Sequence, residues 1–562
     1  MNTIDKYFKN HTSNSPISQK YLNPAKILYS SDSNSKNIVG LIENNCVQTS
    51  VAEDSDIFTL KGEILIDFGV ELYGSIEIIT GDTTNEKEIR VAVQFGESAG
   101  EAMQASDYRH VVQNFEMKLP NYGKVESSLC GFRFVNIKIL DENQAVEIKS
   151  IKAVLHFRDI AYKGSFYCSD PLLNQIWETG AYTVHLNMQN YIWDGIKRDR
   201  LVWAGDVHPA IMVINSVFGN NPIVNDTFEY LRDSTPLPGF MNNFCSYSIW
   251  WLISLRDWYS FHEDFGKLLE NKTYIINLLD YLEEHISQDG VEKLKNNRFL
   301  DWNTLRDKDA IHAGLQALMV MAFQAGAELL EKINCNDKAE SARKKAKLLQ
   351  KYVPQTNNKQ AVALQVLAGQ LDSQYANSKY LSINPLKNLS TFYGYYILQA
   401  RAKAGDMSGC IDLIQKYWGA MLELGATTFW ESFDIAWLRD AAKIDEINSN
   451  KIDVHKTYGE HCYKSYRHSL CHAWAAGPTA WLSEHLLGVN KKSRCLSYQI
   501  TQPPLLDLNL NFVKGTFPVI SGELKIEHKI INGKIDTSIE APSGINIEVL
   551  TNSYDCTYDI CN

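Results

Sequence analysis

The spacing of apolar residues changes twice along this chain, and these changes limit the folds it can adopt. Over the first 160 residues, apolar and polar residues alternate in short runs such as 63–67 and 75–79, which is the period of a half-buried β-strand. From Ser169, Asp170 and Pro171 onward, the apolar spacing is mostly three and four, as in packed helices. After Pro503 and Pro504 the alternation returns. The sequence therefore predicts a multidomain α and β protein in the order β, α, β.

The positions of these changes predict three domains. Many short strands without intervening helices favour a β-sandwich over residues 1–160. Residues 161–490 form the helical domain, where roughly 320 residues leave room for about twelve helices with their loops. That count fits paired helices closed into a toroid and also fits a solenoid, but the chain has no repeat of fixed period. Residues 491–562 form a small C-terminal β-domain that we expect to pack on the helices.

Charge and cysteine content exclude several classes of protein. The chain has 55 Lys and Arg against 66 Asp and Glu, a net charge of -11, and no basic run, so we expect no nucleic-acid partner. It has no run of about 18 apolar residues, so we expect no membrane span. Eleven scattered cysteines without a CxxC motif, behind a polar N-terminus, predict a cytoplasmic protein with reduced thiols. A periplasmic location would require a leader that is not in this sequence.

Aromatic residues make up 11% of the chain, with 28 Tyr, 22 Phe and 12 Trp. Such side chains serve as large core residues, and they also form flat surfaces on which sugar rings stack. Composition does not choose between these two roles.

The segment 193–206 has the highest density of charged residues near large apolar ones. Within 13 residues from Asp194 it holds three Asp, two Arg and one Lys, interrupted by Gly195 and Gly205. One interpretation is a solvated loop with internal ion pairs. The other is a functional cleft, because neighbouring large residues such as Trp203 favour burial, and carboxylates near Arg bind hydroxyl groups and tune acids.

A second segment, 425–433, places the single acidic residue Glu431 in an apolar and aromatic run. Burial there would raise the pKa of Glu431 unless it is paired, and a helix-capping role is the alternative. Asp301 and Trp302 have a similar setting, and His472 lies in a stretch of small residues where a core histidine is the ordinary interpretation.

No pattern of metal ligands or cofactor binding is present. Cys462, His468, Cys471 and His472 do not have the spacing of a zinc site. The chain has no phosphate-binding loop, dinucleotide fingerprint, nucleophile elbow or zincin helix. We therefore expect neither a metal nor a cofactor.

The pattern Asp-Gly-x-x-Arg-Asp-Arg-Leu-x-Trp-x-Gly-Asp at 194–206 resembles the signature loop of the α-L-rhamnosidase family of inverting glycoside hydrolases. The resemblance implies an (α/α)6 barrel, or six-hairpin toroid, between an N-terminal β-sandwich and a small C-terminal β-domain. Weaker similarities to the family lie at 67–69, 95–98, 169–177, 301–302, 425–431 and 541–544.

The resemblance also implies site residues. Asp199 takes the position of the general acid, although its Arg-Asp-Arg is one residue shorter than the family's common Arg-Asp-Glu-Arg, which shortens the reach of the acid. Glu431 takes the position of the general base, and an inserted polar stretch at 440–464 follows it. The substrate-binding positions are Asp194, Arg198, Trp203, Asp206, Trp250 (or Trp251), Trp302 and His472. We also expect Trp430 to face the ligand.

These assignments predict hydrolysis of terminal α-L-rhamnosyl or closely related deoxysugar bonds with inversion. The substrate partner would be a glycan or glycoside carrying terminal L-rhamnose. Two alternatives stay open: a polysaccharide lyase acting on rhamnosyl-glucuronate linkages, because a fold does not fix a chemistry, and a carbohydrate-binding relative without catalysis. The sequence does not indicate an oligomeric state.

Overall fold

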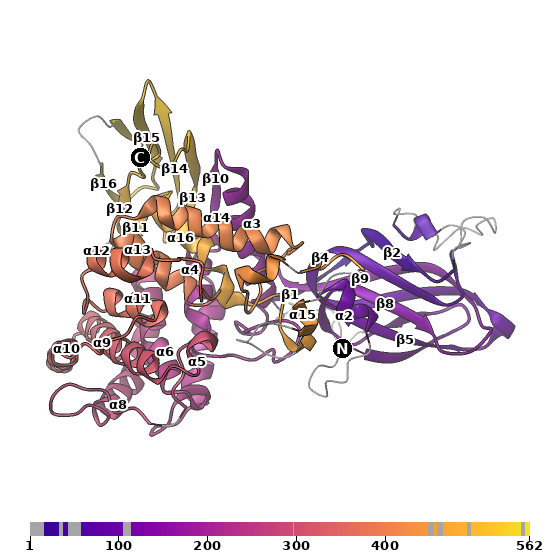
Figure 1. Ribbon diagram of the computed structural model, residues 1–562, viewed down its shortest axis with the longest axis horizontal. Helices are drawn as coiled ribbons and strands as arrows, with labels where there is room; N and C mark the ends of the chain where they lie inside the picture. The colour runs from indigo at the N-terminus through magenta and orange to yellow at the C-terminus, as the bar shows by residue number, and fades with distance from the viewer. Residues whose placement is uncertain are drawn as a thin grey trace, which may run out of the picture. The chain divides into compact units, whose positions relative to one another are not determined.

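Figure 1 shows the computed structural model, in which the predicted order of β, α and β regions is confirmed. Its contacts divide the chain into two compact units. Unit 1 contains residues 1–96, 112–161 and 188–190, and unit 2 contains residues 97–111, 162–187 and 191–562. The structure describes residues 16–32, 38–42, 58–104, 114–295, 297–439, 441–447, 454–457, 465–491, 496–551 and 557–561.

Unit 1 is built on antiparallel strands. Its main path runs in the order β1 (Ile17–Leu22), β9 (Val146–Arg158), β4 (Glu63–Thr83), β8 (Cys130–Ile139), β5 (Ile89–Gly96) and β6 (Asn114–Leu119). Three short strands pair beside this path, β2 (Lys26–Ser30) and β7 (Lys124–Glu126) with β4, and β3 (Phe58–Leu60) with β9.

The long strand β4 explains how this unit encloses a core. Its first part pairs with β2 and β8, and its second part pairs with β9 and β7. The register shifts between Asp67 and Leu72, where Gly69 has a φ of 85° that favours glycine. Ile64, Ile66 and Ile76 alternate into the buried cluster on one face. A single strand thereby connects the part of the sheet that contains β2 and β8 with the part that contains β9 and β7.

The helices of unit 2 form a closed ring. Neighbouring contacts run from α4 to α6, α9, α11, α13, α16 and back to α4. These inner helices are α4 (Val207–Val217), α6 (Cys245–His262), α9 (Lys308–Lys332), α11 (Lys359–Leu367), α13 (Gly394–Lys403) and α16 (Gly477–His485). They alternate in the chain with α3 (Pro171–Asn187), α5 (Pro222–Asp233), α8 (Lys272–Glu283), α10 (Asn336–Gln350), the short α12 (Ser373–Ala376) and α14 (Met407–Glu423). This alternation is the predicted six-hairpin toroid.

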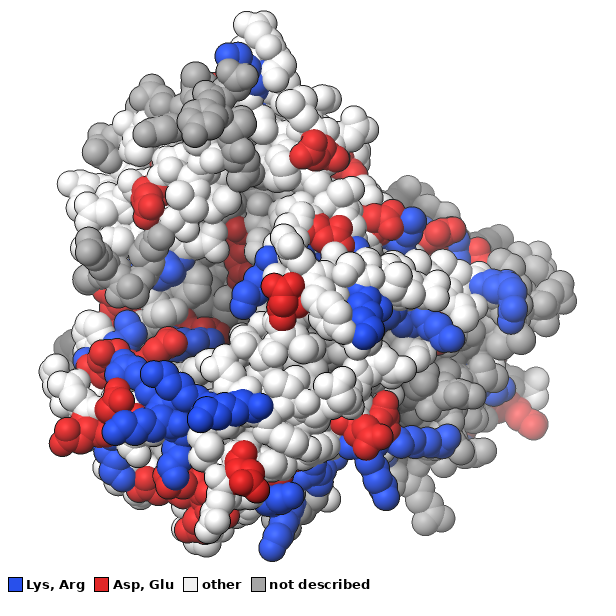
Figure 2. All heavy atoms as spheres, turned by 60° about the vertical axis from the view of Figure 1, so that its left-hand side comes forward, with Lys and Arg blue, Asp and Glu red and all other residues white. Residues whose placement is uncertain are grey.

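The inner helices of the ring are more buried than the outer ones, as α4, α9 and α10 illustrate. All the residues of α4 are buried, which is expected of a helix surrounded by other helices. Among the described helices, α9 is the one long and apolar enough to span a membrane, but 83% of its most apolar window is buried inside the protein, as in a core helix. Helix α10 instead shows a charged face, with ion pairs from Lys338 to Asp280 and from Arg343 to Glu331. Figure 2 shows one face of the molecule, on which basic and acidic side chains are intermixed.

The strands after residue 488 belong to the same compact unit as the helices, on which we expect the C-terminal β-domain to pack. Strand β10 (Ser165–Cys168), which precedes the first helix of the ring, pairs with β13 (Phe512–Val519). The sheet continues through β14 (Gly522–Ile531), β15 (Lys534–Glu540) and β17 (Thr557–Cys561), and a second sheet contains β11 (Val489–Lys491), β12 (Ser497–Thr501) and β16 (Asn546–Leu550). The two ends of the helical region therefore meet in one sheet.

Candidate active site

A cavity of about 240 Å³ lies in unit 2 and contains most of the predicted site residues. Its polar lining residues are Asp194, Arg198, Asp199, Asp206, Glu431 and His472. Its apolar and aromatic lining residues are Trp203, Phe244, Tyr247, Phe299, Trp302, Leu305 and Trp474. Carboxyl groups and one guanidinium thus face a wall of rings, an arrangement that suits a sugar.

The loop before α4 holds its charged residues in place through its own backbone. The Asp194 N–H donates to Leu201 O at 3.0 Å, and the Leu201 N–H donates back to Asp194 Oδ1 at 3.0 Å. Arg200 between them has a φ of 51°, in the left-handed region. At Gly205 a Cβ would lie 2.3 Å from the Tyr247 ring, so only glycine fits there. The charged loop is therefore a built part of the cavity and not a solvated turn.

Arg198 joins the two predicted catalytic carboxyl groups. One of its terminal nitrogens lies 2.8 Å from Asp199 Oδ2, and the other lies 2.6 Å from each Glu431 oxygen. The side chains of Arg198 and Glu431 are 3% and 2% exposed, whereas that of Asp199 is 24% exposed at the cavity. One planar cation therefore separates a buried carboxylate from a more accessible carboxyl group.

Glu431 is held as an anion. Burial alone would raise its pKa, but the charge and hydrogen bonds of Arg198, together with His472 and His468, outweigh burial and lower the pKa to about 2. The Ser469 N–H donates to Glu431 Oε2 at 3.2 Å. The carbonyl of Glu431 accepts hydrogen bonds from Thr391 Oγ1 at 2.6 Å and Trp474 Nε1 at 2.9 Å. An ionised, fixed carboxylate has the properties of a general base.

Two other carboxyl groups of the cavity lie in the opposite electrostatic situation. Burial raises the pKa of Asp194 to about 7, and it raises the pKa of Asp206 well above its usual range. Asp206 Oδ1 accepts a hydrogen bond from Tyr247 Oη at 3.1 Å, and its Oδ2 lies 3.8 Å from His472 Nε2. Burial lowers the pKa of His472 to about 3, so this histidine is neutral near pH 7. Protonated carboxyl groups can both donate to and accept from hydroxyl groups.

The aromatic wall has two parts. Trp203 lies against Phe244 and Tyr247, with ring centroids 6.2 Å from each. On the other part, Trp302 packs edge-on against Phe299 at 5.4 Å. Trp302 begins η4, a 3-10 turn over Trp302–Thr304, whose N-terminus is closed by a reciprocal capping box between Asp301 and Thr304. The turn therefore fixes the position of Trp302 through its own local hydrogen bonds.

Two predicted ligand-facing tryptophans lie elsewhere. Trp250 is fully buried, stacks on Tyr396 at 4.7 Å and does not line the cavity. It sits one helical turn beyond Tyr247 in α6, so the ring of helices encloses it; the neighbouring Trp251 is also fully buried. Trp430 is likewise buried, against Phe433 and His455. For these tryptophans, packing is the correct interpretation.

The sequence missed five lining residues, Phe244, Tyr247, Phe299, Leu305 and Trp474. Phe244 and Tyr247 lie at the start of α6, and Phe299 lies two residues before the predicted Asp301–Trp302 pair. Aromatic residues near a helix start or beside a predicted site residue were the available signal, but the high aromatic content of the whole chain obscures it.

The histidines and cysteines near residue 470 have structural partners. The Ser432 N–H donates to His468 Nε2 at 3.0 Å, and Cys471 is buried beside Asn187. Cys462 lies outside the described residues, as does most of the insertion predicted at 440–464. Among the described residues, no group of three or more His, Cys, Asp or Glu side chains could hold a metal ion.

Comparisons with known proteins agree with this architecture. Residues 161–362 match the family described as the bacterial alpha-L-rhamnosidase 6 hairpin glycosidase domain. An alpha-L-rhamnosidase of Alteromonas sp. (strain LOR) is 22% identical over 470 residues, which cover 74% of this chain and 48% of that protein. A second alpha-L-rhamnosidase, from Formosa agariphila, is 30% identical over 163 residues, which cover 26% of this chain and 16% of that protein. The matched part of this chain thus covers about half of the first relative and a smaller part of the second.

Solved structures show the same fold. The GH78 family rhamnosidase of Bacillus sp. GL1 has a TM-score of 0.74 at 20% identity, over 91% of this chain and 55% of that one. The rhamnosidase from Klebsiella oxytoca with rhamnose bound has a TM-score of 0.66 at 19% identity, over 83% of this chain and 96% of that one. The fold, the ring of paired helices and the matched segment agree: residues 161–362 are similar to the six-hairpin glycosidase domain of bacterial alpha-L-rhamnosidases.

Proposed function

We propose that this protein is a glycoside hydrolase that removes terminal α-L-rhamnosyl, or closely related 6-deoxyhexosyl, residues with inversion. The observation that carries the proposal is Arg198, which keeps Glu431 ionised on one arm and binds Asp199 on the other, inside an aromatic-lined cavity. The relatives named alpha-L-rhamnosidase support the same choice of substrate.

The two carboxyl groups have distinct roles in this mechanism. Asp199 donates its proton to the glycosidic oxygen as the bond from that oxygen to the anomeric carbon breaks. Glu431 takes a proton from a water molecule that attacks the anomeric carbon from the opposite face. Inverting enzymes need about 6.5–9.5 Å between such carboxyl groups to admit the water. Two carboxyl groups on separate arms of one guanidinium are compatible with that spacing.

The remaining lining residues would recognise the sugar. Asp194 and Asp206, whose pKa values burial raises, can exchange hydrogen bonds with ring hydroxyl groups. Phe299, Trp302 and Leu305 offer apolar surface. A 6-deoxy sugar carries a methyl group, and burying one such group contributes about 0.8 kcal/mol to binding. An apolar wall beside polar groups therefore favours a deoxysugar over a fully hydroxylated one.

The test is kinetic. Asp199→Asn and Glu431→Gln should each lower kcat on an aryl α-L-rhamnoside by about 10²–10⁴-fold. The loss in Asp199→Asn should shrink when the aryl group is a better leaving group, because such a group needs less protonation, whereas the loss in Glu431→Gln should not. Proton NMR of the first product should show β-L-rhamnose if the reaction inverts the anomeric centre.

Glu292→Gln is the matched control, because Glu292 is equally buried and is paired with Arg298 away from the cavity. Near-normal turnover in both test variants would refute the assignment. An unsaturated uronate that absorbs ultraviolet light among the products would identify a lyase instead. Calorimetric binding of L-rhamnose without turnover of any rhamnoside would identify a carbohydrate-binding protein.

A further inference from the structure

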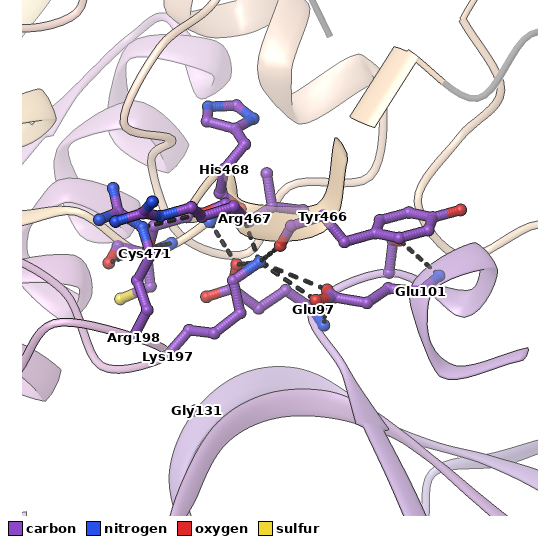
Figure 3. Close-up of polar contacts among 12 residues, drawn as sticks. Glu97, Glu101, Gly131, Lys197, Arg198, Tyr466, Arg467, His468 and Cys471 are labelled. Atoms are coloured by element: carbon purple, nitrogen blue, oxygen red, sulfur yellow. Dashed lines mark hydrogen bonds and ion pairs between the residues drawn. The ribbon is translucent and has the colours of Figure 1, made fainter. Parts of the chain in front are cut away.

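A buried charged cluster lies next to the candidate active site without lining its cavity. Lys197, Glu97 and Glu101 have side chains that are only 1%, 0% and 2% exposed. The two glutamates come from the segment after β5, where Glu101 lies in the short helix α2 (Ala99–Met103) of unit 2. Figure 3 shows the Lys197 ammonium directed at both carboxylates. Burying three charged groups is costly, so the cluster requires an explanation.

Lys197 contacts more than its two counter-ions. Its Nζ lies 3.0 Å from Glu97 Oε2 and 3.2 Å from Glu101 Oε1. It also donates to the carbonyls of Tyr466 and His468, each at 2.6 Å. A lysine ammonium has three N–H donors, so all of its hydrogen-bonding capacity is used inside the protein.

Arg198, next to Lys197 in the chain, donates a hydrogen bond to the same stretch of backbone. Arg198 Nε donates to the carbonyl of Arg467 at 2.7 Å. Lys197 and Arg198 therefore bind three consecutive carbonyls, those of residues 466, 467 and 468. At the other end of the stretch, the Leu470 N–H donates to Glu97 Oε2. Figure 3 shows this strand of backbone above the cluster.

The same stretch holds the predicted general base. Glu431 N–H donates to Ser469 O at 2.9 Å, and the Ser469 N–H donates to Glu431 Oε2 at 3.2 Å. Three residues after Ser469, the N–H of the cavity residue His472 donates to Phe429 O at 2.9 Å. Residues 466–472 therefore lie between the charged cluster on one side and Glu431 on the other.

We propose that Lys197, held by Glu97 and Glu101, is a positioning residue for Glu431. It fixes the backbone of residues 466–470, and that backbone fixes the Glu431 carboxylate opposite Arg198. This role rests on the proposed function, because it matters for catalysis only if Glu431 acts on the attacking water. Lys197, Glu97 and Glu101 do not line the cavity, so we expect their effect on Glu431 to pass through the backbone of residues 466–470.

The first experiment compares two buried lysines. Lys197→Met removes the ammonium and keeps most of the side-chain volume. Lys491→Met is the matched control, because Lys491 is 3% exposed and pairs with buried Glu263 at 2.9 Å elsewhere in unit 2. Lys197→Met should lower kcat about 10- to 100-fold with KM within about threefold, since small displacements of a reacting group have this effect. The control should keep its kcat, although both variants lose stability.

The pH profile separates positioning from general destabilisation. With the backbone loosened, Glu431 loses part of its pairing with Arg198, so its pKa rises from about 2. The acid limb of kcat/KM should therefore move to higher pH in Lys197→Met by about one unit, the equivalent of a tenfold weaker pairing. It should stay unchanged in Lys491→Met.

A conservative pair at Glu97 provides a second test that does not depend on Lys197→Met folding. Glu97→Leu removes the acceptor of the Leu470 N–H and should lower kcat about tenfold. Glu97→Gln keeps an oxygen at that position and should recover most of the activity. Equal kcat values in these two variants, or an unchanged kcat and acid limb in folded Lys197→Met, would overturn the proposal.

Amide hydrogen exchange supplies a readout that needs no activity. Residues 466–472 should exchange about tenfold faster in Lys197→Met than in the wild type, with no change in Lys491→Met. If exchange rises as expected but the wild type turns over no rhamnoside, the proposed function fails and the structural coupling stands. If exchange in this segment is unchanged, the positioning role fails whatever the activity.

Discussion

The cavity holds buried carboxyl groups in two opposite electrostatic states. Glu431 has a pKa lowered to about 2, because Arg198, together with His472 and His468, outweighs burial. Asp194 has a pKa raised to about 7 by burial, and that of Asp206 is higher than its usual range. All three side chains are nearly inaccessible to solvent.

Burial therefore does not decide which of these groups is ionised. The difference is one cation that binds both oxygens of Glu431, whereas Asp194 is only a through-space neighbour of Arg198. A site can in this way hold a base and protonated hydroxyl-binding groups in the same small volume at the same pH. Replacing Arg198 and Asp194 one at a time tests these two roles.

Removing the cation should have the largest effect. Arg198→Met leaves Glu431 buried without its partner, so its pKa rises, and the acid limb of kcat/KM should move to higher pH while kcat falls about 10²–10⁴-fold. Arg401→Met is the matched control, because Arg401 is a buried arginine paired with Asp406 away from the cavity. An unchanged acid limb in Arg198→Met would show that the guanidinium does not set the ionisation of Glu431.

A smaller effect is expected at Asp194. Below pH 7 the Asp194 carboxyl is protonated, and an asparagine resembles it in shape and charge. L-Rhamnose should therefore bind wild type and Asp194→Asn similarly at pH 6. Between pH 6 and pH 8 the wild-type Kd should weaken about tenfold as Asp194 ionises, whereas the variant Kd should stay level. Parallel calorimetric titrations would contradict this if both proteins lost affinity together.

The same substitution should change how stability depends on pH. Because the folded pKa of Asp194 is about 7, its contribution to stability is complete below the unfolded value near pH 4 and is lost as the pH rises through 7. Between pH 5 and pH 8, the wild type should lose on the order of 1–3 kcal/mol of unfolding free energy relative to Asp194→Asn. Chemical denaturation at both pH values measures this difference. A constant difference would mean that the folded pKa is not raised.

The smallest catalytic effect is expected at Glu484. Burial also raises the pKa of this carboxyl group to about 7, and it bonds Tyr395 outside the cavity. Glu484→Gln should keep kcat/KM within about twofold. Like Asp194→Asn, it should lose less unfolding free energy than the wild type as the pH rises from 5 to 8. A large loss of turnover in this variant would mean that buried carboxyl groups matter for activity irrespective of their place.

The sequence predicted the architecture well because its signals are local. The change from alternating to helical spacing near Pro171 needs only a short window, and β10 with α3 begin there. The charged loop at 194–206 was recognisable for the same reason. The pairing of β10 with β13 was not recognisable, because it joins residues about 350 positions apart.

The direction of the Glu431 pKa could not be predicted for a related reason. Its partner Arg198 is 233 residues away in the chain, so burial was visible in the local sequence and the pairing was not. Glu97 gives a similar lesson. Its neighbours resemble a β-sandwich motif, yet its carboxylate belongs to unit 2 and binds the backbone of Leu470.

The 3-10 turn that carries Trp302 has a consequence for how such a site can diversify. The Asp301 and Thr304 side chains close the turn, and Asn303 Nδ2 donates to the carbonyls of Asn388 and Leu389. The indole of Trp302 and the side chain of Leu305 take no part in these bonds, so replacing them would change the lining of the cavity and leave these hydrogen bonds in place. If the proposed function holds, substitutions at these two positions should therefore alter which sugar is bound before they alter the groups that cleave it.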